Sequence, residues 1–207
     1  MNKRSTGLGP AIWLCLFCAA AFGAVTALVN AGRIAGLDRA LIGGVQSLES
    51  AELTAVSKLL GELVSGYAVY VIIAVVCLIV LFARNIRGFL LFAAVIAGSR
   101  LLNTLLKPIF QRERPEIHRI MEETGYSFPS GTAMSAFALF AALAVVLWRY
   151  IPSRAGKTAL IAVCACFILL IGVSRVYLGV HYPSDIIAAF LAGGFWLFVC
   201  LLVSGML

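Results

Sequence analysis

The chain has 207 residues, of which 62% are hydrophobic and only 12% are charged, and its mean hydropathy is +1.04. Soluble domains are roughly 45–50% apolar and about 25% charged, so this composition excludes an ordinary soluble protein and predicts an integral membrane protein. The formal charge of +7 does not by itself indicate a nucleic-acid partner, because the cations lie mostly at the ends of apolar segments.

The apolar segments predict an all-α membrane protein with six membrane spans. At about 20 residues per span, they lie at about 10–31, 66–83, 87–106, 131–151, 158–177 and 184–206. The segment 37–62 carries several charges and has leucines at helical spacing, so we predict an amphipathic helix, or a pair of helices, at the membrane interface rather than a seventh span. Residues 1–207 form a single domain in this interpretation, since no linker or repeat interrupts them.

The N-terminus resembles a signal peptide in one respect, because Lys3 and Arg4 precede an apolar run that contains small residues. The run continues to about Val29, which is long enough to span a membrane and longer than a usual signal-peptide core. We therefore expect the first helix to be retained.

The charges of the predicted loops differ between the two sides of the membrane. One side carries only cations, namely Lys3, Arg4, Arg84, Arg87, Arg149, Arg154 and Lys157, while all nine Asp and Glu lie on the other side or near its boundary. The positive-inside rule then places both termini in the cytoplasm. This topology accounts for the net charge, so nucleic-acid binding is not needed. Loops 107–131 and 178–184 face the periplasm or the extracellular side, where ATP is scarce, which favours a hydrolase over a kinase.

Three polar stretches interrupt the apolar sequence, each at the predicted outer end of a span. They run over 107–115, 129–132 and 174–185. Arg175 lies near the end of a span, where a charge is costly and usually functional, and its planar fork can bind two phosphate oxygens. Lys107 and Arg114 alone would also fit a headgroup anchor, and they gain weight only beside the other stretches. Together the stretches predict one external site for a phosphoryl group.

The second and third stretches supply the donors and the nucleophile that such a site needs. Ser130 and Gly131 open the fourth span, where the unpaired N–H groups of a helix N-terminus attract anions; N-capping by Ser130 is a compatible alternative. His181 follows Arg175, and Asp185 lies four residues beyond it. At this spacing the carboxylate can reach Nδ1 and hold the imidazole with Nε2 facing a substrate.

The order K-x6-R-P, P-S-G-x and S-R-x5-H resembles the three-part signature of the phosphatidic acid phosphatase type 2 superfamily, over about residues 100–190. The resemblance implies that His181 attacks phosphorus to form a phosphohistidine and that Asp185 supports it. It also implies that no metal or other cofactor is used. The residues that it implies bind phosphate are Lys107, Arg114, Ser130, Gly131 and Arg175.

The middle motif departs from the family pattern, in which the fourth residue is a His that protonates the leaving oxygen. This chain has Thr132 there, and a hydroxyl has no suitable pKa for that role. The loss of a positioned general acid costs about 10²- to 10⁴-fold in rate. Three explanations of Thr132 remain: an engineered, weakened variant, a natural pseudo-phosphatase, or a proton donor elsewhere in the chain. The presence of all the other motif residues favours the first. His118, the only other histidine, fits a solvated loop residue better than a replacement acid.

The substitution predicts a preference among substrates. When a lipid monophosphate is hydrolysed, the leaving group is a strongly basic alkoxide, which needs the acid. When a lipid diphosphate is hydrolysed, the leaving group is a phosphate, whose second pKa is about 6, and it needs the acid much less. We therefore expect the activity of this chain to favour diphosphates.

The expected substrate is a membrane lipid phosphate that enters the site laterally with its tails in the bilayer. Undecaprenyl diphosphate is our first choice, followed by phosphatidylglycerol phosphate and phosphatidic acid. A lipid A phosphatase and a phosphotransferase are alternatives on the same chemistry. A non-catalytic lipid-phosphate binder or transporter is a different class, which Thr132 favours. We expect no nucleic-acid partner and no obligate protein partner.

Overall fold

The computed structural model describes residues 5–206, with side chains from residue 9, and contains helices but no strand within that range. The helices are α1 (Ser5–Asn30), α2 (Ala35–Gln46), α3 (Ala51–Ser65), α4 (Tyr67–Phe82), α5 (Ile86–Phe110), α6 (Gly131–Trp148), α7 (Arg154–Tyr177) and α8 (Pro183–Ser204). Five of them are long and apolar enough to cross a membrane, or six spans result if the bent pair α3 and α4 counts as one. The predicted all-α membrane fold is confirmed.

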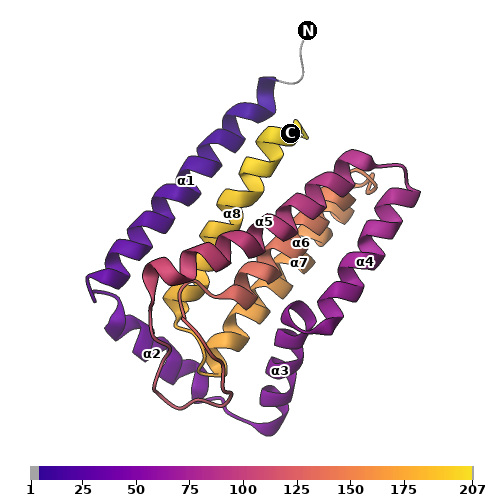
Figure 1. Cartoon of the computed structure of the whole chain (residues 1–207). Coiled ribbons are helices and arrows are strands. Elements are labelled where there is room, and N and C mark those ends of the chain that lie inside the picture. The colour runs from indigo at the N-terminus through magenta and orange to yellow at the C-terminus, as the bar shows by residue number, and fades with distance from the viewer. Residues whose placement is uncertain (1–4, 207) are drawn as a thin grey trace.

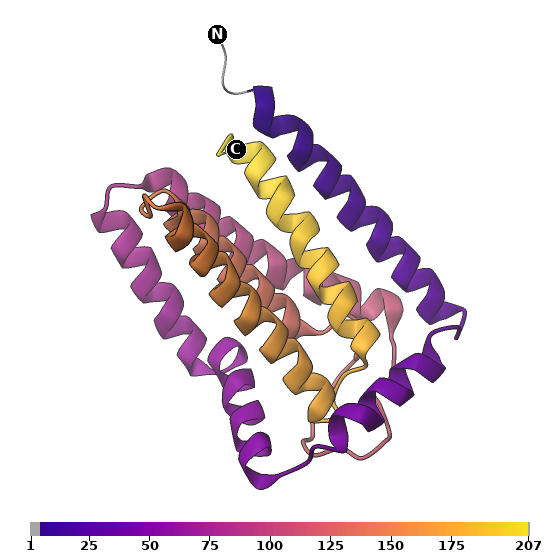
Figure 2. The ribbon, with the colours of Figure 1, turned by 180° about the vertical axis from the view of Figure 1, so that it is seen from behind.

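The bundle is built around α6, which packs against α5, α7 and α8 (Figure 1). Helix α1 lies along α8 on one side of the molecule, and α4 lies on the other side (Figure 2). Helix α2 crosses the end of the bundle where α7 ends and α8 begins, and it contacts both. This end, which also contains the segment 111–130 and the turn 178–182, is called the site end below.

The segment 37–62 forms two helices, and they differ in their packing. Helix α3 contacts α6 and α7 in addition to α4, so it belongs to the bundle. A bend of 50° near Gly66 separates α3 from α4. Helix α4 alone is about 24 Å long at 1.5 Å per residue, which is short of a bilayer core of about 30 Å. We infer that α3 completes the second span, so that an interfacial position stays a prediction for α2 alone.

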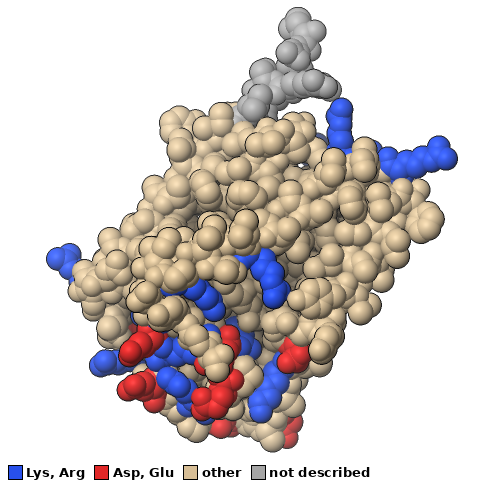
Figure 3. Space-filling view, viewed as in Figure 1, with Lys and Arg blue, Asp and Glu red and all other residues tan. Residues whose placement is uncertain are grey.

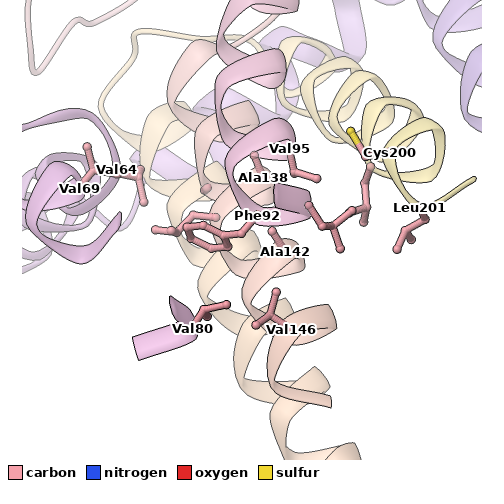
Figure 4. Packing of buried hydrophobic residues seen from close by; sticks show 14 of the residues in the cluster. Val64, Val69, Val80, Phe92, Val95, Ala138, Ala142, Val146, Cys200 and Leu201 are labelled. Atoms are coloured by element: carbon pink, nitrogen blue, oxygen red, sulfur yellow. The ribbon is translucent and has the colours of Figure 1, made fainter. Parts of the chain in front are cut away.

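The core of the bundle is rich in small and β-branched side chains, with leucines and Phe92 between them. Figure 4 shows Ala138, Ala142 and Val146 of α6 facing Phe92 and Val95 of α5. Membrane helices gain little from the hydrophobic effect and associate through close van der Waals contact, which small residues allow. Many large apolar side chains remain exposed on the outer faces of α1, α4, α5 and α7, as a lipid-facing surface requires.

The acidic residues gather at the site end of the molecule, where many of the basic residues also lie (Figure 3). The asymmetry follows from the sequence, since every Asp and Glu belongs to α2, α3, the flanking turns, the segment 111–130 or the first turn of α8. The orientation of this end relative to a cell remains a prediction from the loop charges.

Candidate active site

The site begins at the end of α5, which runs four residues beyond the predicted end of its span. Lys107 therefore lies in the last turn of a helix instead of a loop. Gln111 adopts a left-handed conformation with φ 46°, which ends the helix and turns the chain back over the bundle. The charged neighbours of Lys107 are Arg114, Glu123 and Asp185.

Arg114 is buried and anchors the segment 111–130 to the turn before α8. Its Nε donates to the carbonyl oxygen of Gly125 at 3.0 Å, and its Nη2 donates to that of Thr124 at 2.9 Å. Its Nη1 donates to the carbonyl oxygen of Val180 at 2.9 Å. Because these bonds fix the guanidinium plane, the positive charge has a defined place beside the next residue, His181.

His181 is fully buried, and its two ring nitrogens have different neighbours. Nη1 of Arg114 lies 3.2 Å from Nε2. A guanidinium can only donate, so in the neutral ring that accepts this bond Nε2 is the unprotonated nitrogen and Nδ1 carries the proton. Nδ1 lies 3.3 Å from Oγ of Ser127 and 3.5 Å from Oδ2 of Asp185. The predicted pairing of His181 with Asp185 is thus present, and the hydroxyl of Ser127 is added to it.

Asp185 is itself held by a network that reaches α2. Its Oδ2 accepts from the backbone N–H of Tyr182 at 2.9 Å, which places it at the first turn of α8. Its Oδ1 lies 2.5 Å from Nη1 of Arg112. Nη2 of Arg112 pairs with Asp38 at 2.8 Å, and the hydroxyl of Ser184 donates to the same Asp38 oxygen at 2.6 Å. A buried carboxylate with this many donors stays ionised and fixed in place.

Arg175 lies at the end of α7 and is buried against α3. Gly61 allows this approach, since a Cβ there would lie 2.6 Å from Nη1 of the arginine. Nη2 forms an ion pair with Glu123. Nε has no hydrogen-bond partner among the described residues. A buried guanidinium donor is expected to be paired, so this N–H is available to a ligand.

Glu123 brings the two arginines and the histidine together. Its Oε1 lies 3.2 Å from Nη2 of Arg114 and 3.7 Å from Nε2 of His181, and its Oε2 pairs with Arg175. Burial alone would raise the pKa of this carboxyl, but the positive charge of His181 when that ring is protonated, together with the charges of Arg175 and Arg114, outweighs burial and holds the pKa well below its usual range. Glu123 is therefore ionised in this structure.

The start of α6 lies beside the start of α8. Oγ of Ser130 accepts from the backbone N–H of Ala133 at 3.3 Å, so the N-capping alternative describes its side chain here. Its own N–H donates to the carbonyl oxygen of Asp185 at 3.3 Å. Gly131 opens the helix, and Thr132 is buried in its first turn. The hydroxyl of Thr132 forms no hydrogen bond within residues 9–206.

His118 lies away from the buried site, at the surface. Its side chain is 60% exposed, and Nε2 pairs with Glu49 at 2.8 Å. It therefore ties the segment 111–130 to the turn between α2 and α3, and it has no contact with His181.

Comparison with known proteins decides the family. A profile described as the PAP2 superfamily matches residues 87–207, which is more than half of the chain. The chain belongs to the PAP2 superfamily. The match covers α5 to α8 and thus every residue of the three polar stretches. The resemblance inferred from the motifs is confirmed.

Two curated PAP2-type relatives and one solved structure are similar over different lengths. Phosphatidylglycerophosphatase B of Bacillus subtilis is 35% identical over 54% of this chain and 56% of its own. Lipid A 1-phosphatase of Rhizobium johnstonii is 37% identical over 56% of this chain and 46% of its own. The chain spans about half the length of these relatives. The crystal structure of a transmembrane PAP2-type phosphatidylglycerolphosphate phosphatase from Bacillus subtilis superposes with a TM-score of 0.81 at 27% identity, over 92% of this chain and 93% of that one.

The PAP2 site has two approaches of different character. A polar cavity of about 560 Å³ opens beside Arg114 and is lined by Arg39, Glu113, Glu116, Ile117 and Tyr182 as well. An apolar groove of about 180 Å³ lies between α1, α5 and α8, and is lined by Ala19, Phe22, Leu102, Leu106, Ala192 and Phe195. Its lining residue Leu106 precedes Lys107 in the sequence of α5.

No group of three or more potential metal ligands among His, Cys, Asp and Glu occurs within the described residues of this PAP2 domain.

Four residues of the PAP2 site were not singled out from the sequence. They are Asp38, Arg112, Glu123 and Ser127. Arg112 and Glu123 lie in a stretch whose many charges fit a solvated loop, so composition gave no reason to choose among them. Asp38 offered a signal, because it lies one helical turn before buried Ile42 on the apolar face of α2. A charge on such a face needs a partner, which the sequence does not name.

Proposed function

We propose that this chain removes a phosphate from a membrane lipid through a phosphohistidine on His181. The observation that supports this most directly is the convergence of Arg114, Arg175 and Nε2 of His181 on one carboxylate. A carboxylate presents two anionic oxygens to the same donors that a phosphoryl group would use, so Glu123 stands in for the phosphate in this structure. The unpaired Nε of Arg175 adds one more donor for a third oxygen.

The proposed first step is an in-line attack by Nε2 on phosphorus. The attack requires a lone pair on Nε2, and the Nδ1–H tautomer supplies it. As the ring gains positive charge, Ser127 and Asp185 on the Nδ1 side stabilise it. The two arginines stabilise the equatorial oxygens, over which negative charge is spread in the transition state. No step of this scheme calls for a metal.

The lipid part of the substrate would lie in the apolar groove that ends at Leu106. Phe22, Phe110 and Phe128 form an aromatic cluster beside it, with ring centroids 5.0–6.0 Å apart. This surface recognises hydrocarbon and does not distinguish one headgroup from another. Undecaprenyl diphosphate is our first choice because the absence of a His at position 132 penalises a phosphate leaving group least. Phosphatidylglycerol phosphate, phosphatidic acid and the 1-phosphate of lipid A follow, the first and last supported by the names of the relatives.

We place the site on the periplasmic or extracellular face, with both termini in the cytoplasm. The support is the distribution of charge, because the end opposite to the site carries Arg84, Arg87, Arg149, Arg154 and Lys157 and no acidic residue among those described. Water as the acceptor makes the reaction a hydrolysis; a second lipid as the acceptor would make it a phosphotransfer.

A second candidate is a lipid-phosphate binder or transporter that does no chemistry. One observation favours it: Thr132 leaves the start of α6 without an ionisable side chain. Such a protein would bind the lipid at the same arginines but would form no bond to His181.

The test is phosphate release from a panel of lipid monophosphates and diphosphates in mixed micelles, with Thr132→His as the reference. We expect the wild-type chain to release phosphate from both classes, and Thr132→His to accelerate monophosphates by a larger factor than diphosphates. Brief reaction with ³²P-labelled substrate followed by rapid denaturation would label His181. Saturable lipid binding with no label and no release would identify a binder. Equal acceleration of both classes would refute the assignment of position 132 to leaving-group protonation.

A further inference from the structure

Among residues 9–206, Glu123 is the one acidic side chain that lies within 4 Å of Nε2 of His181, the nitrogen that we propose attacks phosphorus. Its carboxylate lies 3.7 Å from Nε2 of His181 and pairs with Arg114 and Arg175. Its side chain remains 27% exposed, so it lies at the boundary between the buried site and solvent. It belongs to the segment 111–130, which has no helix, so its side chain can rotate toward solvent without the movement of a helix.

A substrate phosphate must displace this carboxylate, because both need the same arginine donors. The phosphorus has to lie in front of Nε2, between that nitrogen and the present position of Glu123. The displaced carboxylate then lies on the side of the phosphorus opposite Nε2. In an in-line displacement the leaving oxygen departs on that same side, so Glu123 ends beside the leaving group.

The displacement also changes the protonation of Glu123. In the free site, a protonated His181 and the positive charges of Arg175 and Arg114 outweigh burial, lower the pKa of the carboxyl and keep it ionised. When a phosphate takes over these arginines, the carboxylate loses its partners and gains an anionic neighbour. A like charge at this distance favours the protonated acid. The carboxyl therefore becomes a proton donor only when the substrate is present.

The other titratable groups of the site are unsuited to this role. Asp185 lies on the Nδ1 side of His181 and is occupied by Arg112 and Ser127. His118 is at the surface with Glu49.

The nearby tyrosines and Lys107 are no better placed. The ring of Tyr182 lies 4.0 Å from the guanidinium of Arg112, and the hydroxyl of Tyr177 is bonded to Thr54 at 2.8 Å. Tyr126 is exposed. Lys107 and the arginines serve to hold the phosphate, a role in which each must keep its proton and its positive charge.

We propose that Glu123 is a catalytic residue that supplies the proton which the family's histidine, absent at Thr132, would otherwise supply. The inference rests on the proposed phosphatase function. In the first step the lone pair of Nε2 forms the P–N bond, the P–O bond to the leaving group breaks, and the proton of the Glu123 carboxyl moves to the leaving oxygen. In the second step the Glu123 carboxylate accepts a proton from water as the water oxygen bonds to phosphorus. The P–N bond then breaks, returning its electron pair to Nε2, and phosphate is released.

The deciding experiment compares Glu123→Gln with Glu122→Gln in the full-length protein in mixed micelles. Glu122 is a matched control, because it is the next residue and its side chain is 85% exposed. The two substrates are phosphatidic acid, with an alkoxide leaving group, and undecaprenyl diphosphate, with a phosphate leaving group. We expect Glu123→Gln to lower kcat for phosphatidic acid about 10²-fold or more and for the diphosphate less than about tenfold. Glu122→Gln should stay within about twofold of wild type on both substrates.

A second arm places both variants in the Thr132→His background. If Glu123 replaces the missing histidine, Thr132→His should restore most of the phosphatidic acid activity that Glu123→Gln removes. Retained diphosphate hydrolysis by Glu123→Gln shows that the variant is folded. Equal losses on both substrates, or faster turnover of both because an obstructing carboxylate is gone, would overturn the inference while leaving the phosphatase function standing. Phosphate release by neither wild type nor Thr132→His would overturn the proposed function and the inference with it.

Discussion

The two ends of the bundle carry arginines in very different settings. At the site end, Arg114 and Arg175 are only 6% and 4% exposed, and both form ion pairs with the carboxylate of Glu123. At the opposite end, Arg154 is exposed at the start of α7. Arg149 makes a single side-chain bond there, to Asn85 at 2.8 Å. The sequence has arginines at both ends. Only their burial and their partners distinguish the arginines of the candidate site from those whose charge sets the membrane orientation.

The difference has an energetic reason. An exposed arginine at a membrane boundary keeps its hydration and costs little. A buried guanidinium loses its hydration and needs anionic or carbonyl partners to remain there. At the site end those partners include Glu123, the residue that we propose a substrate phosphate displaces. The comparison therefore predicts that variants at the site end change catalysis, while matched variants at the opposite end leave it unchanged.

The largest expected effect comes from removing the nucleophile. His181→Asn should lower phosphate release by at least about 10³-fold, because the amide cannot form the phosphoryl-enzyme bond. It should also abolish ³²P labelling of the protein. The control is His118→Asn, which removes a surface histidine paired with Glu49 and should retain nearly full activity. Labelling that survives in His181→Asn would assign the nucleophile to another residue.

The next prediction compares the replacement of an arginine by lysine at each end of the bundle. Arg175→Lys keeps the charge but removes the planar donors that face Glu123 and the substrate, so we expect kcat/KM to fall about 10²-fold. Arg154→Lys makes the same change at the exposed opposite end and should alter kcat/KM less than about twofold. Initial rates with one lipid phosphate measure both variants. A comparable loss of kcat/KM in Arg154→Lys would show that the two ends of the bundle do not differ in their contribution to catalysis.

The sequence predicted the parts of this molecule that follow from local rules. The apolar runs gave the helices to within a few residues, and the spacing of His181 and Asp185 gave their contact, because i and i+4 positions meet across one turn. Arg175 was chosen because a charge at the end of a span is costly, and Arg114 because it completes the K-x6-R-P pattern beside the other two stretches. These predictions needed no knowledge of tertiary structure.

The predictions fell short where a contact joins segments that are distant in the sequence. Asp38 reaches Arg112 and Ser184 only because α2 crosses the ends of α7 and α8. Glu123 was one of several charges in a loop, and only the folding of that loop over the bundle selects it. The bend near Gly66, which makes α3 part of the bundle, was also missed, since the charges of α3 suggested an interfacial helix.

A smaller effect is expected from the network that positions Asp185. Asp38→Asn weakens the hold on Arg112 and, through it, on the carboxylate beside His181. Because a small misplacement of a catalytic group costs up to about 10²-fold, we expect kcat to fall about tenfold while KM stays nearly constant. Glu52→Gln, an exposed acid on α3, serves as the control. A rise in KM with unchanged kcat would show that Asp38 shapes the substrate opening instead.

The smallest effect concerns stability and comes from the depressed pKa of Glu123. A carboxyl whose pKa is lower in the folded state contributes stability above its unfolded value, here about 4.5, and loses that contribution as the pH falls below it. At pH 7 in phosphate-free buffer, Glu123→Gln should therefore melt about 2–4 °C below wild type, because it leaves Arg114 and Arg175 without their shared anion. The difference should shrink as the pH is lowered below 4.5, because the carboxylate then takes up a proton in the unfolded chain while it is still ionised in the folded one. Glu122→Gln should show neither the shift nor its pH dependence, since that side chain faces solvent.

Inorganic phosphate added at pH 7 should raise the Tm of Glu123→Gln more than that of wild type, because the ion then binds arginines that no carboxylate occupies. A gap in Tm that persists unchanged to pH 3 would mean that Glu123 stabilises the loop by packing and not by its charge.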